Sequence, residues 1–453
     1  MLFHRIETEG LSHYSYLLGS GNEAVVIDPR RDIDIYIDIA GRNEARIRYI
    51  LETHRNEDYV AGSVELAGRT GAEIWHADSQ LTYRYGQAAE DGQKWKLGSM
   101  SLRALATPGH TPGSMSYLLS DSKGTPWLVF TGDTLFAGEV GRTDLSGSEI
   151  TREMAGLLYE SIFGKILPLG DGVIVCPAHG SGSVCGSTIS DRPVTTIGLE
   201  RLTNPRLQYK EGEDFVNETA REMEKSPYFH KMEELNLAGP PRLSSLPEPA
   251  ALSPDAFATL VPESIILDTR FDGFGAAHIP GSICIWPEGI SGFAGWFLPY
   301  DRPILLVSDK NHVEKVIEYL RRIGYDRISG YLAGGIRNWN RTGRKTGTIR
   351  TVTVPGLCHL LDSDEDTWVL DVRGQAELDK TGSIPHAHHI HLTEIIERSG
   401  EIPRDKSVFV FCGSGLRAMI AASFLKTEGW QNLTVVLGGF AAWNSVSCPV
   451  SKI

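Results

Sequence analysis

An internal repeat is the sequence feature that most constrains how this chain can fold. Two segments in its C-terminal half carry the same motifs in the same order, at an offset of about 104 residues. The first copy has ILDTR at 266–270, AHIPG at 277–281 and a glycine pair at 334–335. The second has VLDVR at 369–373, GSIPH at 382–386 and a glycine pair at 438–439. The offset is far longer than the period of a solenoid, so the repeat predicts two tandem copies of one small domain.

Within each copy, short runs rich in Val and Ile alternate with amphipathic segments of roughly 10–15 residues. This alternation is typical of βαβ units, in which parallel strands are joined by crossover helices. The repeat therefore predicts two small α/β domains, each with a parallel sheet.

A larger segment lies upstream of the repeat. Its end is marked by Gly239-Pro240-Pro241 and Pro247-Glu248-Pro249, which cannot continue a helix. At about 150 residues per domain, a chain of 453 residues favours about three domains. We predict an N-terminal domain at 1–240 that ends in a charged helical extension, and repeat domains at 251–346 and 352–453.

Composition restricts the partners and the compartment. The net charge of −13 argues against a nucleic-acid or anionic membrane surface. No run of about 18 apolar residues predicts a membrane span, and the N-terminal stretch lacks the pattern of an export signal. The six cysteines lack the density of a disulfide framework, which favours a cytoplasmic protein. Five are expected to be simple thiols: Cys176, Cys185, Cys284, Cys358 and Cys448.

Histidines and carboxylates gather where apolar runs end in the N-terminal segment. They form four blocks, centred on His54, His110, Asp133 and His179. Loops at strand ends can aim side chains from distant parts of a chain at one point. Imidazole together with carboxylate suits zinc or non-haem iron, so these blocks predict a metal site.

These blocks resemble the metallo-β-lactamase superfamily, which implies an αββα sandwich with metals at one edge of its sheets. The family's first block is HxHxDH, whereas this chain has His54, then Asn56, Asp58 and Tyr59. The resemblance leaves only Asp58, His179 and a shared Asp133 for a second metal. It keeps His54, His110 and Asp133, an arrangement that leaves three open positions on Fe(II).

This pattern within the superfamily resembles the persulfide dioxygenases, as does the segment GDTLFAGEVGRTD at 132–144. The resemblance implies one Fe(II) per chain and oxidation of a low-molecular-weight persulfide by O2 to sulfite and thiol. Arg142 and Asp144 are expected to form a salt-linked pair that braces the ligand loop or orients substrate. Four further residues are expected to line the pocket or to hydrogen-bond to the ligands: Asn56, Asp58, Tyr59 and His179.

The second repeat contains a cysteine between an apolar run and a helical pattern, in VFVFCGSGLR at 408–417. Backbone N–H groups of such a glycine-rich loop, together with the helix start, form an anion-binding nest that activates a thiol. Cys412 is therefore a candidate nucleophile, with Arg417 as a second catalytic candidate. The persulfide-binding or anion-binding loop would be Gly413, Ser414, Gly415 and Leu416.

This domain resembles the rhodanese sulfurtransferases, whose CxxGxR loop is matched by Cys412, Gly415 and Arg417 and whose Asp-x-Arg is matched by Asp371 and Arg373. The corresponding loop of the first copy reads VSDKNH at 307–312, without a thiol, and so resembles an inactive rhodanese. The order of parts resembles the persulfide dioxygenase/rhodanese fusion proteins of sulfide detoxification.

Two other functions remain open on the sequence. One is a thioester hydrolase of the glyoxalase II type with an accessory rhodanese, and the other is a persulfide carrier or sensor without catalysis. The expected partners are persulfide, O2, thiosulfate, sulfite and thiols, with neither nucleic acid nor membrane, and a homo-oligomer is expected.

Overall fold

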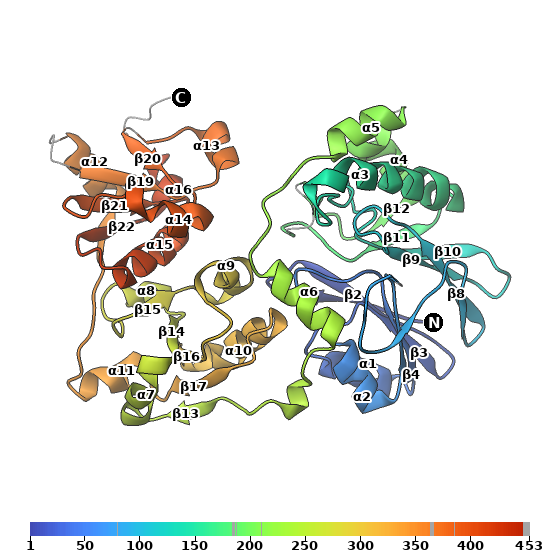
Figure 1. Cartoon of the computed structure of the whole chain (residues 1–453), viewed down its shortest axis with the longest axis horizontal. Coiled ribbons are helices and arrows are strands. Elements are labelled where there is room, and N and C mark those ends of the chain that lie inside the picture. Colours follow the sequence, from blue (N-terminus) through green and yellow to red (C-terminus); the bar gives the residue numbers. More distant parts are fainter. Residues whose placement is uncertain are drawn as a thin grey trace. The chain divides into compact units, whose positions relative to one another are not determined.

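The computed structural model describes residues 1–446 except 79, 184–185, 187, 210, 363–366 and 385. The chain divides into two compact units (Figure 1). The first holds Met1–Leu246 together with Arg321–Gly324, and the second holds Pro247–Leu320 and the chain from Tyr325 onward. Among the described residues, no helix has the length and apolar character needed to cross a membrane.

The first unit is built on two sheets of six strands each. The first sheet has the order β1 (Leu2–Thr8), β2 (His13–Ser20), β3 (Glu23–Ile27), β4 (Arg46–Glu52), β5 (Glu73–His76) and β6 (Gln87–Ala88). The second sheet has the order β12 (Thr195–Thr196), β11 (Ile174–Pro177), β10 (Pro126–Gly132), β9 (Met115–Ser120), β8 (Met100–Ala106) and β7 (Lys94–Leu97). Strands β3 to β6 are parallel, and β10 pairs with β11 in parallel.

Alternation along the strands explains why both faces of each sheet are buried. In β3, Val25 packs into the core between the sheets, whereas Val26 packs against the outer helices. The first sheet is covered by α1 (Asp34–Arg42) and α2 (Ser63–Thr70), which contribute Tyr36 and Leu66. The second is covered by α3 (Thr151–Tyr159), the π-helical turn η2 (Glu160–Ile166), α4 (Ile197–Thr203) and α5 (Gly212–Thr219). These layers form the expected αββα sandwich, and α6 (Phe229–Ala238) follows it.

The second unit contains two parallel sheets of the same topology, as the repeat predicts. The first has the order β13 (Ala250–Leu252), β17 (Ile328–Leu332), β16 (Ile304–Val307), β14 (Ile265–Asp268) and β15 (Ser282–Cys284). The second has the order β18 (Arg350–Thr353), β22 (Leu433–Leu437), β21 (Ser407–Phe411), β19 (Thr367–Asp371) and β20 (Ala387–His389).

Helices connect the strands of both copies. The first copy has α7 (Pro254–Leu260), α8 (Phe271–Phe274), α9 (Ile290–Phe297), α10 (Val313–Arg322) and α11 (Gly335–Arg341). The second has α12 (Val354–Asp362), α13 (Gln375–Thr381), α14 (Ile395–Arg398), α15 (Leu416–Thr427) and α16 (Gly439–Trp443).

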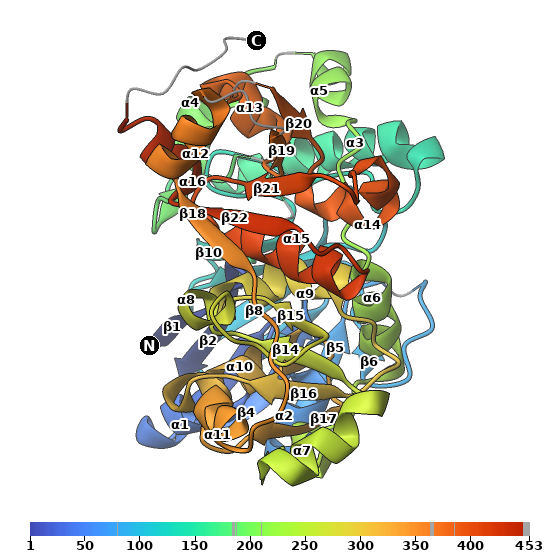
Figure 2. The ribbon, with the colours of Figure 1, turned by 90° about the vertical axis from the view of Figure 1, so that its left-hand side faces the viewer.

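Helix α15 joins the two copies within this unit. It lies between β22 of its own sheet and β15 of the first copy (Figure 2). The Cys284 backbone N–H donates to Ser423 Oγ at 2.9 Å, and the rings of Phe297 and Phe424 meet edge to face with centroids 5.6 Å apart. Burial on two sides explains why this helix is apolar around most of its circumference.

Candidate metal centre and sulfur-transfer loop

A cluster of metal-binding side chains lies at one edge of the sandwich, where four strands end. His54 follows β4, His110 follows β8, Asp133 directly follows β10 and His179 follows β11. The end of β10 lies close to the end of β4. Gly132 has a φ of +52°, and a Cβ on this residue would lie only 2.6 Å from Thr53 Oγ1. A side chain at position 132 would therefore displace the two ligand loops from each other.

The structure brings His54, His110 and Asp133 together and adds Glu57, which the sequence analysis missed. Donor atoms of these four buried residues all lie within 4.8 Å of one another. Asp133 Oδ2 lies 3.5 Å from His110 Nε2 and 3.9 Å from His54 Nε2. The only sequence signal for Glu57 was its place in the middle of the first block.

Hydrogen bonds fix the tautomer of both histidines. The Thr53 hydroxyl donates its single proton to Asp28 Oδ2 at 2.8 Å, so Thr53 Oγ1 must accept from His54 Nδ1 at 2.9 Å. His110 Nδ1 likewise donates to the Arg142 carbonyl at 2.9 Å. In the neutral imidazoles, each Nε2 thus presents a lone pair to the cluster, where His110 Nε2 lies 3.2 Å from Glu57 Oε1. The residues fit a bound metal ion.

Burial and charge adjust the ligands for this role. Burial lowers the pKa of His54 to about 4, which keeps its imidazole neutral and able to bind a metal. Burial also opposes ionisation of Asp133, but the neighbouring His179, His54 and His110 hold the pKa of that carboxyl well below its usual value. Asp133 is therefore an anion at any ordinary pH.

Hydrogen bonds join His179 to Asp133 and Asp58, the three residues that the sequence leaves for a second metal. His179 Nδ1 lies 2.8 Å from Asp133 Oδ1, and His179 Nε2 lies 2.9 Å from Asp58 Oδ2. The two carboxylates raise the pKa of His179 well above its usual value despite burial. Asn56 Nδ2 donates to the His54 carbonyl, and the tilted rings of Tyr59 and His13 have centroids 4.0 Å apart. Both nitrogens of His179 are thus in hydrogen bonds with carboxylates.

Arg142 and Asp144 form a buried ion pair beside the cluster rather than within it. Arg142 Nε and Nη2 donate to the two Asp144 oxygens at 2.7 and 2.8 Å. Arg142 also donates to the Met223 carbonyl, and the Met223 N–H donates to Asp144. The pair therefore holds the backbone carbonyl that accepts from His110.

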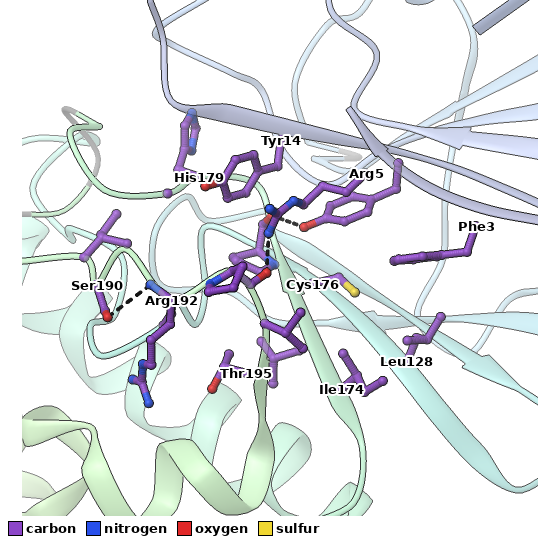
Figure 3. Close-up of a pocket in the computed structure, with 18 of the residues that line it drawn as sticks. Phe3, Arg5, Tyr14, Leu128, Ile174, Cys176, His179, Ser190, Arg192 and Thr195 are labelled. Atoms are coloured by element: carbon purple, nitrogen blue, oxygen red, sulfur yellow. Dashed lines mark hydrogen bonds between the residues drawn. The ribbon is translucent and has the colours of Figure 1, made fainter. Parts of the chain in front are cut away.

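A separate apolar cavity of about 450 Å³ opens at the side of the sandwich (Figure 3). Phe3, Leu128 and Ile174 line it, and His179 reaches its wall. Cys176 also lines it as a free thiol whose pKa is raised by burial. The cavity holds neither His54 nor His110, so it is distinct from the metal cluster.

The sulfur-transfer loop lies between β21 and α15. Cys412 follows Phe411, its Sγ accepts the Gly415 N–H at 3.1 Å, and Gly415 has φ +111°. Residues 413–416 thus curve around the sulfur, and α15 begins at Leu416. The start of α16 also holds the loop, because the Phe440 N–H donates to the Cys412 carbonyl at 2.8 Å.

Arg417 does not reach the sulfur by a hydrogen bond; instead it pairs with Glu377 on α13. The two guanidinium nitrogens donate to the two carboxylate oxygens at 2.5 and 2.7 Å. Behind the loop, Arg373 pairs with Asp371 at 2.6 Å and lies over the Phe440 ring. In the first copy, Ser308 occupies the loop position of the thiol and bonds to Thr269 at 2.8 Å.

The other cysteines differ in state. Cys176, Cys284 and Cys412 are free and buried. Cys358 is disulfide-bonded, which corrects the expectation of a simple thiol at that position. Cys185, Cys448 and Pro385 of the repeat motif lie outside the described residues.

Together, the fold and the two sites define a metallo-β-lactamase-fold domain followed by two rhodanese-like domains. The sequence model of the Metallo-beta-lactamase superfamily matches residues 8–179, and that of the Rhodanese-like domain matches residues 253–342 and 357–446. The chain belongs to the metallo-β-lactamase superfamily. Its metallo-β-lactamase domain is homologous to persulfide dioxygenases and is followed by tandem rhodanese domains.

The relatives include enzymes of two kinds. Persulfide dioxygenase ETHE1, mitochondrial, of Bos taurus is 33% identical over 205 residues, which cover 43% of this chain and 71% of that protein. Hydroxyacylglutathione hydrolase GloC of Haemophilus influenzae is 28% identical over 208 residues, covering 41% and 88% respectively. The crystal structure of a metallo-beta-lactamase from Staphylococcus aureus is similar with a TM-score of 0.64 and 30% identity, over 74% of this chain and 98% of that one.

Proposed function

We propose that the N-terminal domain is a mononuclear iron persulfide dioxygenase and that the second repeat is an active sulfurtransferase. The dioxygenase takes a low-molecular-weight persulfide, such as glutathione persulfide. One persulfide, one O2 and one water give one thiol and one sulfite, with release of protons. The observation that carries this proposal is the buried cluster of His54, His110 and Asp133, beside which His179 bonds to Asp133 and Asp58.

Iron in this cluster would supply the redox chemistry that couples O2 to a closed-shell persulfide, which zinc lacks. The protein's own residues prepare the site for it. Thr53 and the Arg142 carbonyl hold the Nδ1 protons of His54 and His110, which directs both Nε2 lone pairs inward. His179 holds Asp133 as an anion, so a single divalent ion is favoured.

Cys412 carries sulfur in the second reaction. Its thiolate attacks the outer sulfur of thiosulfate, the S–S bond breaks, and sulfite leaves with the bonding electron pair. A thiolate then attacks the outer sulfur of the Cys412 persulfide and regenerates the Cys412 thiolate. The inward N–H groups of the loop, among them that of Gly415, stabilise the anionic sulfur. The product, a small persulfide, is the substrate of the dioxygenase.

Metal analysis separates this proposal from thioester hydrolysis, the activity class of a relative with a two-metal site. We expect one iron per chain in protein produced with iron, and loss of that iron in Asp133→Asn. Two zinc ions per chain without iron, together with cleavage of a glutathione thioester, would favour the hydrolase instead.

A further inference from the structure

Glu57 lies as close to the two cluster histidines as Asp133 does. Its Oε1 is 3.2 Å from His110 Nε2 and its Oε2 is 3.9 Å from His54 Nε2. The corresponding distances from Asp133 Oδ2 are 3.5 and 3.9 Å. Donor atoms bonded to one ion at about 2.0–2.2 Å lie roughly 3.0–3.5 Å apart. The distances from Glu57 to the two histidines therefore match those from Asp133, the expected carboxylate ligand.

The position of Glu57 is set by a buried contact from another element. Asn236 of α6 donates from Nδ2 to the backbone carbonyls of Asn56 and Tyr59 at 2.7 and 2.8 Å, and its Oδ1 accepts from the Ala61 N–H at 2.9 Å. These bonds hold the backbone on both sides of Glu57. The fold of the loop therefore places the buried Glu57 carboxylate in the cluster.

The surroundings of the carboxylate suit a bound cation. Its side chain is 1% exposed, and the groups that face its oxygens at 3.2 and 3.9 Å are the Nε2 atoms of His110 and His54. With their protons on Nδ1, neutral imidazoles offer these Nε2 atoms as metal donors. A metal ion among the two imidazoles and two carboxylates would be attracted to all four donor groups, which lie within 4.8 Å of one another.

We propose that Glu57 is a fourth protein ligand of the metal ion held by His54, His110 and Asp133. The inference deepens the proposed function, on which it rests for the metal. Two imidazoles and two carboxylates would hold the ion, which would supply the redox chemistry that couples the persulfide to O2. The two carboxylate charges would balance a divalent ion, and Glu57 lies in the same loop as His54.

The test compares Glu57→Gln with Glu52→Gln. Glu52 is also buried and ends β4, but it bonds to Tyr85 outside the cluster. Dissociation constants for Fe(II) and Zn(II) are measured by competition with a chelator, and the Co(II)-substituted proteins are compared by visible absorption. We expect Glu57→Gln to weaken both ions by about 10–100-fold and to change the Co(II) bands, with Glu52→Gln close to the parent protein.

Equal affinities and identical Co(II) spectra for the two variants would overturn the role of Glu57. That result is independent of the proposed activity, because neither readout requires turnover. If instead the parent protein binds all three ions through Glu57 but consumes no O2 with persulfide, the dioxygenase proposal fails while the fourth ligand stands.

Discussion

At the scale of single residues, the Thr53 hydroxyl decides which nitrogen of His54 faces the metal cluster. Its only proton is committed to Asp28, so it can only accept from His54 Nδ1. Such outer contacts orient a ligand and set its tautomer, although they never touch the ion. The site therefore depends on residues that a ligand motif does not contain.

Replacing Thr53 by the isosteric valine tests this dependence. Thr53→Val removes the acceptor of the Nδ1 proton, and we expect iron affinity to fall about 10–100-fold. Thr70→Val, which removes a hydroxyl that donates to Leu66 on α2, serves as the control. Chelator competition measures both. Equal affinities would show that the Thr53 hydroxyl does not position His54.

The Arg142–Asp144 pair gives a pH-dependent contribution to stability. Burial opposes ionisation of Asp144, but the hydrogen bonds from Arg142 and the Met223 N–H lower its pKa below the usual value. A carboxyl with a lowered folded-state pKa stabilises the fold above its unfolded pKa of about 3.9 and loses that contribution as the pH falls through the folded-state pKa.

Asp144→Asn should therefore destabilise the first unit by about 3–5 kcal/mol at pH 7, because it leaves Arg142 buried without its carboxylate. The difference from the parent should shrink as the pH is lowered from 5 toward 3. Urea unfolding at several pH values measures this. A difference that stays constant with pH would contradict the assignment of the effect to ionised Asp144.

At the scale of elements, the second glycine of each repeat's glycine pair has a similar left-handed backbone conformation, but the space around it differs between the two copies. Gly439 and Gly335 have φ of +50° and +62° at the starts of α16 and α11. A Cβ on Gly439 would lie 2.2 Å from the Cys412 carbonyl oxygen, whereas on Gly335 the nearest atom would be the Ser308 carbonyl oxygen at 3.7 Å. The loop of the second copy therefore lies tightly against the start of α16, whereas the loop of the first copy leaves room at the start of α11.

The two glycines form a matched pair for experiment. Gly439→Ala should displace the Cys412 loop and lower thiosulfate-to-thiol transfer by about 100-fold. Gly335→Ala carries the same strain of a left-handed residue but no clash with the loop, so transfer should stay near the parent rate. Comparable losses in both variants would show that backbone strain, rather than contact with the loop, controls the activity.

At the scale of the whole molecule, the two proposed reactions belong to different compact units and use different side chains. Cys412→Ser should abolish thiosulfate-to-thiol transfer and leave persulfide-dependent O2 uptake unchanged, because the serine oxygen cannot carry a sulfane sulfur while the metal cluster is untouched. Both activities are assayed on the full chain. Persistence of sulfur transfer would mean that Cys412 is not the carrier.

Much of this organisation could be predicted from the sequence, because it depends on local patterns and on a repeat. The strand-end blocks together with the resemblance to the metallo-β-lactamase superfamily predicted that His54, His110 and Asp133 meet. The repeat and its alternating pattern predicted two parallel sheets. Glu57 and the Glu377 partner of Arg417 could not be predicted. Their placement depends on contacts such as that of Asn236 with Asn56, which are 180 residues apart in the chain.

The central claim is that the metal cluster oxidises persulfide sulfur, and its most direct measurement is O2 uptake together with sulfite release. Iron-loaded protein given glutathione persulfide should consume one O2 for each sulfite formed, and His110→Ala should reduce both to background. O2 uptake at background in protein that holds one iron per chain would contradict the account.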